Sequence, residues 1–97
     1  MPTYISLLRY TQQGIATIKQ SPTRLEAAKE AYLRAGGELK GFYLTMGQYD
    51  AVAIVELPDD RAGAKLALAL GAQGNVRSES MRAFPEEEFR RIVAELP

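Results

Sequence analysis

The sequence predicts an α+β fold in which a four-stranded antiparallel sheet carries two crossover helices, with one further helix at the C-terminal end. Four stretches alternate apolar and polar residues and are rich in branched or aromatic side chains. Two longer stretches with apolar residues at helical spacing separate them in the order β-α-β-β-α-β. With 97 residues the chain has the length of one domain, so residues 1–97 are treated as a single unit.

The first half of the chain contains one strand and one helix. Residues 2–10, PTYISLLRY, combine aromatic and branched side chains and stop at the polar TQQG, which predicts a strand. Ser21 and Pro22 predict the start of a helix, because a hydroxyl caps the first turn and proline is tolerated there. Apolar residues then follow at helical spacing up to the glycine pair 36–37, namely Leu25, Ala28, Tyr32 and Ala35.

The second half begins with two strands, residues 38–46 and 50–57, on either side of a tight corner. An acidic pair after the second strand can cap a helix over residues 61–74, which glycines end. Residues 75–84 alternate but are polar, which predicts a fourth strand at the edge of the sheet. Residues 85–96 predict an amphipathic helix with acids in its first turn and the apolar face Phe89, Ile92, Val93 and Leu96.

This order is the plan of ferredoxin-like folds, in which both crossover helices cover one face of the sheet. Such a sheet should be apolar on one side only, yet the predicted strands are apolar on both. On strand 2–10 one face has Ile5 and Leu7, and the other has Tyr4, Leu8 and Tyr10. On strand 38–46 the two faces have Phe42 and Leu44, and Leu39 and Tyr43. On strand 50–57 they have Val52 and Ile54, and Ala53 and Val55. We therefore expect a homo-oligomer, at least a dimer, in which two such sheets pack face to face. The alternative is that the C-terminal helix folds over the open face.

Composition excludes several function classes. Lys plus Arg and Asp plus Glu both number 12, so no net charge favours nucleic acid or an anionic membrane as a partner. The chain has no Cys and no His, which removes thiolate chemistry and the commonest metal ligand and general base. We expect no cofactor and no metal. The N-terminal residues lack the features of a signal peptide and no apolar stretch has the length of a membrane span, so a cytoplasmic location is predicted.

The corner GQYD, residues 47–50, contains the residues with the clearest individual roles. Gly47 is predicted to be structural, because a type II′ hairpin turn needs a positive φ at its first central residue. Asp50 opens a strand, where aspartate is depleted, so it is predicted to accept a turn amide or pair with an arginine. Tyr49 beside it can pack or donate a hydrogen bond. A ligand-binding or proton-transfer role for Asp50 and Tyr49 stays open as the alternative.

Several short motifs in the same order resemble the GYD family of small bacterial proteins. They are GFY at 41–43, GQYD at 47–50, VAIVE at 52–56, LALALGAQGNVR at 66–77 and RAFPEEEF at 82–89. The resemblance covers nearly the whole chain. It implies a ferredoxin-like domain of the dimeric α+β-barrel type, and it implies no particular activity.

Two function classes are consistent with these features. The first is a small-metabolite-binding or sensing module, with a pocket along the sheet lined by Tyr4, Tyr43 and an arginine such as Arg77. The second is a cofactor-free enzyme of the monooxygenase or isomerase type found among dimeric α+β barrels, with Asp50 as acid or base and Tyr43 or Tyr49 as hydrogen-bond donor. We favour the binding module, because the chain lacks His and Cys and is rich in tyrosine.

Overall fold

A computed structural model describes all 97 residues of the chain. The predicted α+β order with an additional C-terminal helix is confirmed, and the boundaries lie within two residues of the predicted ones. The elements are β1 (Thr3–Tyr10), α1 (Gln12–Ala16), the 3-10 helix η1 (Ile18–Gln20), α2 (Ser21–Arg34), β2 (Glu38–Leu44), β3 (Ala51–Glu56), α3 (Asp60–Ala72), β4 (Val76–Ala83) and α4 (Glu86–Ala94).

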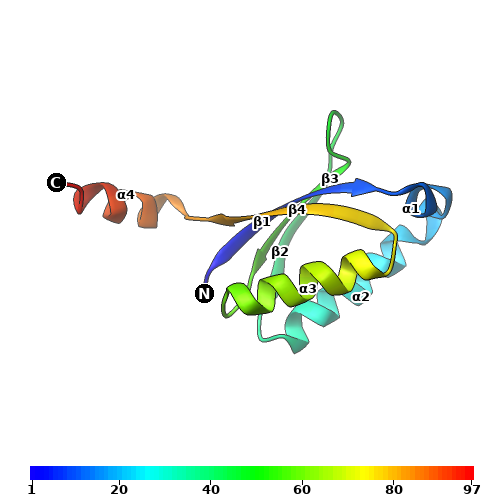
Figure 1. Cartoon of the computed structure of the whole chain (residues 1–97), viewed down its shortest axis with the longest axis horizontal. Helices are drawn as coiled ribbons and strands as arrows, with labels where there is room; N and C mark the ends of the chain where they lie inside the picture. The colour runs from blue at the N-terminus through cyan, green and yellow to red at the C-terminus, as the bar shows by residue number, and fades with distance from the viewer.

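The four strands form one antiparallel sheet in the order β2-β3-β1-β4. Helices α2 and α3 lie side by side on one face of this sheet, as the ferredoxin-like plan requires (Figure 1). The polar strand β4 lies at an edge, as its composition predicts. Helix α4 continues beyond the end of β4 and projects away from the rest of the fold (Figure 1). None of the helices is long and apolar enough to cross a bilayer.

The core lies between the sheet and the two covering helices. Alternate side chains of β1 and β3 point toward the helices, and Tyr4 and Val55 are buried there with Leu57 and Tyr32. Tyr32 is one of the apolar residues that the helical spacing placed on the inner face of α2. Small residues such as Ala28 pack against the same cluster. The core is therefore built from one face of each element.

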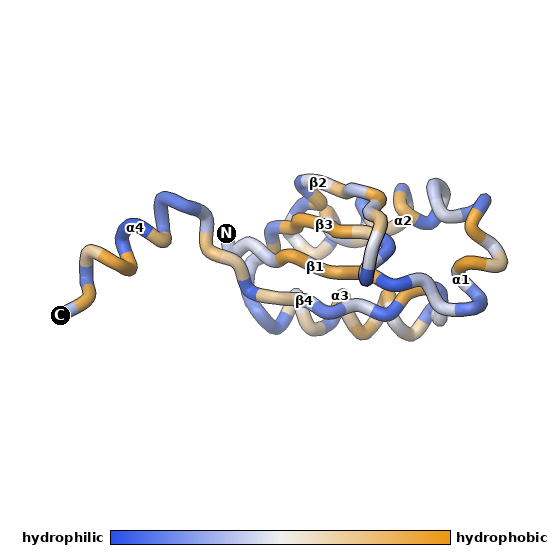
Figure 2. The backbone as a smooth tube through the Cα atoms, turned by 90° about the horizontal axis from the view of Figure 1, so that it is seen from above, coloured by the Kyte–Doolittle hydropathy of each residue, from blue (hydrophilic) through white to orange (hydrophobic).

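The opposite face of the sheet is also apolar, and no element of the chain covers it. Ile5 of β1 lies between Ile54 of β3 and Met81 of β4 in the strand register. Leu7 lies opposite Val52 in the same way. In Figure 2 the strands β1 and β3 are largely hydrophobic along their length, and α4 lies well away from them. The C-terminal helix therefore does not fold over this face within the single chain, contrary to the alternative prediction.

The predicted faces of β2 need one correction. The register of β2 on β3 shifts between Leu39 and Gly41, so one residue is bulged out of the ladder. Leu39 and Phe42 consequently share the helix-covered face, opposite Val55 and Ala53, although simple alternation placed them on opposite faces. The reason is that an inserted residue reverses the side of every residue that follows it.

Two predicted turn details also differ from the structure. Ser21 is the first residue of α2 and makes no capping hydrogen bond, because η1 runs directly into α2 and gives this residue helical torsions. The β2–β3 connection comprises residues 45–50, so it is longer than the two-residue turn that was predicted. Gly47 nevertheless has the positive φ that was predicted, at 134°.

Candidate functional site

A cavity of about 370 Å³ lies between the helix-covered face of the sheet and helices α2 and α3. Its walls are mostly apolar, with leucine and alanine side chains from the helices facing branched and aromatic side chains from the strands. Polar side chains gather at its two ends and along β4. A volume of this size, apolar walls and few polar groups are typical of a small-molecule site.

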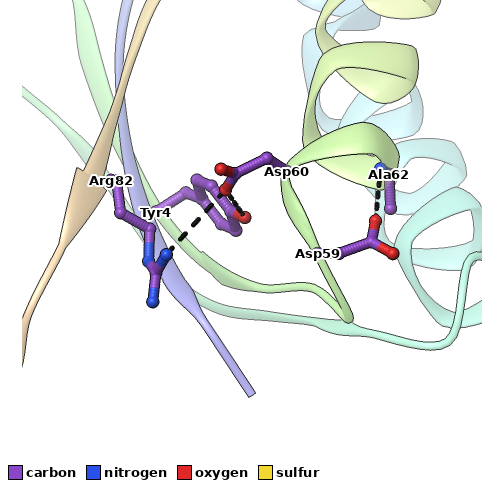
Figure 3. Close-up of polar contacts among 5 residues, drawn as sticks. All are labelled: Tyr4, Asp59, Asp60, Ala62 and Arg82. Atoms are coloured by element: carbon purple, nitrogen blue, oxygen red, sulfur yellow. Dashed lines mark hydrogen bonds and ion pairs between the residues drawn. The ribbon is translucent and has the colours of Figure 1, made fainter.

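Tyr4, Asp60 and Arg82 form a polar cluster at one end of the cavity, shown in Figure 3. The Tyr4 hydroxyl donates a hydrogen bond to Asp60 Oδ1 at 2.5 Å. An Arg82 nitrogen lies 3.9 Å from the same oxygen. The side chains of Asp60 and Arg82 are 79% and 38% exposed, so this end of the cavity opens to solvent between α3 and β4.

Three different elements position this cluster. Tyr4 and Arg82 are register partners on β1 and β4, so their side chains leave the same face of the sheet. The Arg82 guanidinium also stacks near the Phe84 ring, 5.0 Å from its centroid. Asp60 is held in the first turn of α3, where Asp59 caps the helix by accepting the Ala62 amide at 2.9 Å (Figure 3). A carboxylate in this turn is stabilised by the helix dipole.

The electrostatics keep the Tyr4 phenol protonated. Burial, followed by the hydrogen bond to Asp60, raises the pKa of Tyr4 above its ordinary value of 10.0. Burial alone raises the pKa of Tyr32, which also lines the cavity. Tyr4 is therefore a hydrogen-bond donor at neutral pH, and Asp60 and Arg82 provide one charge of each sign beside it.

Several of the remaining polar groups of the cavity are hydrogen-bonded to protein partners. Ser6 and Ser80 share a hydrogen bond of 2.9 Å between their hydroxyls on the sheet. At the far end the Tyr10 hydroxyl lies 3.3 Å from the Ser21 hydroxyl. Arg24 is held by the backbone before α2, since it donates to the carbonyl oxygens of residues 14 and 17. The Tyr4 end is the part of the cavity where a carboxylate and a guanidinium reach solvent.

The GQYD corner lies outside this cavity. Asp50 Oδ2 accepts the backbone amide of Tyr10 at 2.9 Å, and the Asp50 amide donates to the carbonyl of Leu8. The Tyr49 hydroxyl donates to Glu79, and this contact raises the pKa of Tyr49. Arg9 lies over the Tyr49 ring, 4.6 Å from its centroid. The corner therefore ties the β2–β3 connection to β1 and β4.

The structure does not bring the predicted ligand-binding residues together. Tyr4 lines the cavity, whereas Tyr43 and Arg77 lie on the helix-free face of the sheet. A ligand role for Tyr43 and Arg77, and a functional role for Asp50 and Tyr49, stay predictions. Asp60 and the serines of β1 and β4 were not among the predicted site residues. Asp60 was interpreted only as a helix cap, and the serines carry no sequence signal beyond their position on one face of a strand.

Comparison with known proteins identifies the family. The model of the GYD domain matches residues 4–93. This chain belongs to the GYD domain family. The resemblance inferred from the short motifs is thereby confirmed. A relative from Thermus thermophilus, described as a glutamine synthetase and cystathionine beta-lyase binding protein, is 31% identical over 86 residues, which are 88% of this chain and 90% of the relative.

Two solved structures share the GYD chain's fold. A feast or famine regulatory protein from M. tuberculosis, complexed with L-methionine, superposes with a TM-score of 0.67 at 19% identity. The match covers 88% of this chain and only 51% of that protein, so the chain spans about half its length. The protein TTHA0845 from Thermus thermophilus superposes with a TM-score of 0.54 at 26% identity, covering 88% and 95% of the two chains. These likenesses support the ferredoxin-like fold.

Proposed function

We propose that this GYD domain protein is a small-molecule-binding module that works as a homo-oligomer. The observation that carries the proposal is the 370 Å³ cavity, whose apolar walls end at the cluster of Tyr4, Asp60 and Arg82. Apolar walls provide affinity without selectivity, and a few placed polar groups orient a ligand. The cavity has both features.

The chemistry of the cluster indicates the class of ligand. A molecule with an apolar body would occupy the wall region, and its polar end would meet a phenol donor, a carboxylate and a guanidinium. A zwitterionic head group satisfies both charges, because its ammonium pairs with Asp60 and its carboxylate with Arg82. The structural neighbour that holds L-methionine supports the inclusion of apolar amino acids among the first compounds tested.

Self-association belongs to the proposal because the helix-free face of the sheet is apolar and uncovered. Ile5, Leu7, Val52 and Ile54 form its centre. A second copy of the chain is the cover that needs no further partner. We expect the chain to form at least a dimer at micromolar concentration. We also expect the protein to be located in the cytoplasm.

A second candidate function is protein binding, favoured by the relative named for its binding of two enzymes. A ligand-binding module can also recognise an enzyme, so the two functions are compatible. No comparable observation favours the alternative of an enzyme that uses Asp50 as its acid or base. The Asp50 carboxylate accepts a hydrogen bond from the Tyr10 amide, and Asp50 does not border the cavity.

The test of ligand binding uses a matched pair of substitutions on α3. Ala67 lines the cavity, whereas Ala69 is exposed on the same helix. Native mass spectrometry of protein purified from its host should show a bound small molecule in the natural sequence and in Ala69→Leu. Ala67→Leu should lose it, because the larger side chain fills the cavity.

The added compounds complete the test. A shift in thermal unfolding with an apolar amino acid or another metabolite should appear for Ala69→Leu and disappear for Ala67→Leu. A ligand that binds both variants equally would place the site elsewhere. Failure of every compound, together with no co-purified mass, would contradict the binding function.

A further inference from the structure

The cavity has a second polar end, opposite the Tyr4 end. Tyr4 and Tyr10 both border the cavity from β1, and at about 3.3 Å for each residue of a strand their Cα atoms are about 20 Å apart. Ser21 and Arg24, in the first turn of α2, border the cavity beside Tyr10. Tyr10, Ser21 and Arg24 together form the Arg24 end of the cavity.

The Arg24 end carries a positive charge that no acidic side chain balances. Asp60 is the only acidic residue that borders the cavity, and it lies beside Arg82 at the Tyr4 end. Arg24 forms no ion pair, and the first turn of α2 contains no acidic residue. Asp50 binds the backbone amide of Tyr10 but does not border the cavity. An occupant that displaces water from Arg24 therefore needs to bring a negative charge of its own.

The Arg24 end also has hydrogen-bond donors that the chain does not use. Arg24 makes three hydrogen bonds, all to oxygens of residues 14 and 17, so at least two of its five N–H groups have no protein partner. The hydroxyls of Tyr10 and Ser21 lie 3.3 Å apart, and this contact uses only one of their two protons. A carboxylate accepts hydrogen bonds from both kinds of donor, and the planar guanidinium fits it well.

The region between the two ends favours a narrow, apolar occupant. Leu25 and Ala28 of α2 and Ala67 and Leu70 of α3 border this region, with Val55 on the sheet. A volume of about 370 Å³ that extends over about 20 Å is narrow, so it suits a chain better than a ring system. A free amino acid with its head group at the Tyr4 end is too short to reach Arg24 across this length.

We propose that the Arg24 end is a carboxylate subsite, and that the cavity takes an elongated carboxylic acid with an apolar chain. The carboxylate accepts hydrogen bonds from Arg24 and from the hydroxyl pair, and its single negative charge balances the single excess positive charge. The chain lies along the apolar walls and directs its other end toward the Tyr4 end. This inference rests on the proposed function, because it assigns a ligand class to the same cavity.

Calorimetric titration with decanoate and decan-1-ol at neutral pH tests the subsite, since the two probes share a chain and differ in charge. Arg24→Gln should weaken the binding of decanoate about tenfold or more and that of decan-1-ol less than about threefold. Arg34→Gln removes the same charge from an exposed position of the same helix and should leave both affinities unchanged. The subsite is overturned if Arg82→Gln, and not Arg24→Gln, weakens decanoate, because the carboxylate then lies at the Tyr4 end.

A second pair of variants keeps Arg24, whose hydrogen bonds also hold the segment before α2. Ser21→Asp places a carboxylate three residues before Arg24, where it can pair with the guanidinium and is favoured by the helix dipole. It should bind decanoate about tenfold more weakly than Ser21→Asn, which has the same shape without the charge. Circular dichroism checks that both variants are folded. Equal affinities of the two folded variants for decanoate overturn the subsite.

The two probes also separate failure of the subsite from failure of the binding function. If decan-1-ol binds to the natural chain and decanoate does not, the carboxylate subsite is wrong and the cavity still binds apolar molecules. Failure of both probes overturns the subsite. If, in addition, no small molecule co-purifies with the protein, the binding function itself is contradicted.

Discussion

Tyr4 connects the core of the protein to the open end of the cavity. Its ring is buried in the cluster with Tyr32 and Val55, and its hydroxyl reaches the exposed carboxylate of Asp60. The residues of the GQYD corner act differently, because their hydrogen bonds go to backbone groups and to other strands. Substitutions at these two places should therefore have different consequences.

Tyr4→Phe should change how stability depends on alkaline pH. The pKa of Tyr4 is raised in the folded state, so its stabilising effect is present below pH 10 and is lost as the pH rises through the folded-state pKa. Removing the hydroxyl should cost about 1 kcal/mol at pH 8. Urea unfolding should show a smaller loss of stability between pH 8 and pH 11 for Tyr4→Phe than for the natural chain. Equal losses would contradict this role, because Tyr32 is present in both proteins.

Gly47→Ala should destabilise the protein through the backbone alone. Gly47 has a φ of 134°, which other residues avoid, and nothing lies within 4 Å of an added Cβ. The expected cost is about 1–3 kcal/mol. Gly71→Ala is the control, since a Cβ there is equally free of contacts and its backbone is helical. Thermal unfolding should separate the two, and equal melting temperatures would mean that the corner relaxes to another geometry.

Substitutions of Asp50 test whether this residue has a structural or a functional role. Asp50→Asn keeps an oxygen that can accept the Tyr10 amide, so the change in stability should be about 1 kcal/mol or less. Asp50→Ala removes the acceptor and should cost about 1–3 kcal/mol. Neither variant should weaken ligand binding, since Asp50 lies outside the cavity. Loss of binding or turnover in a folded Asp50→Asn variant would restore the enzyme interpretation.

Among the secondary-structure elements, α3 has the most direct influence on the cavity. It provides one wall through its small residues, and its first turn holds Asp60 beside Tyr4. The position of that turn depends on the cap formed by Asp59. The strand β4 completes the open end with Arg82, so the site depends on how α3 and β4 are placed relative to each other.

Loss of the α3 cap should be measurable. Asp59→Ala leaves the Ala62 amide without its side-chain acceptor and should cost about 1 kcal/mol. Asp59→Ser keeps a capping oxygen and should retain most of the stability. Urea unfolding followed by circular dichroism compares the three proteins. Identical midpoints for Asp59→Ala and the natural chain would show that the cap does not stabilise α3.

At the scale of the whole molecule, the chain has two apolar surfaces beyond its core. One is the helix-free face of the sheet, and the other is the outward face of α4. A domain of this size buries only about two-thirds of its unfolded surface, so its margin of stability is thin and association strengthens it. Oligomeric state and folding stability should consequently change together.

A charge in the centre of the sheet face should separate the subunits. Leu7 lies opposite Val52 at the centre of this face, so Leu7→Glu would place a carboxylate in an apolar interface. Light scattering at micromolar concentration should give a dimer or larger particle for the natural chain and a monomer for Leu7→Glu. Leu33→Glu, at an exposed position of α2, should leave the mass unchanged. A natural chain that is monomeric at this concentration would contradict the predicted association.

Local patterns in the sequence determine much of the secondary structure of this protein. The order of the elements, the inner face of α2, the Asp59–Asp60 start of α3 and the edge position of β4 all follow from periodicity, capping and composition. These features depend on residues a few positions apart, so one sequence is enough to predict them. The two apolar faces of β1 and β3 were predictable for the same reason.

Only the tertiary structure decided how distant residues meet. The bulge in β2 changed which side Phe42 faces, and alternation alone does not predict such a shift, although Gly41 inside the strand is a residue type that often marks one. Tyr4 meets Asp60 across 56 positions of sequence, and it meets Arg82 through strand pairing. The cavity itself exists because small side chains on the helices face the sheet across a gap. Such contacts depend on register and packing between whole elements, which alternation within one strand or helix does not determine.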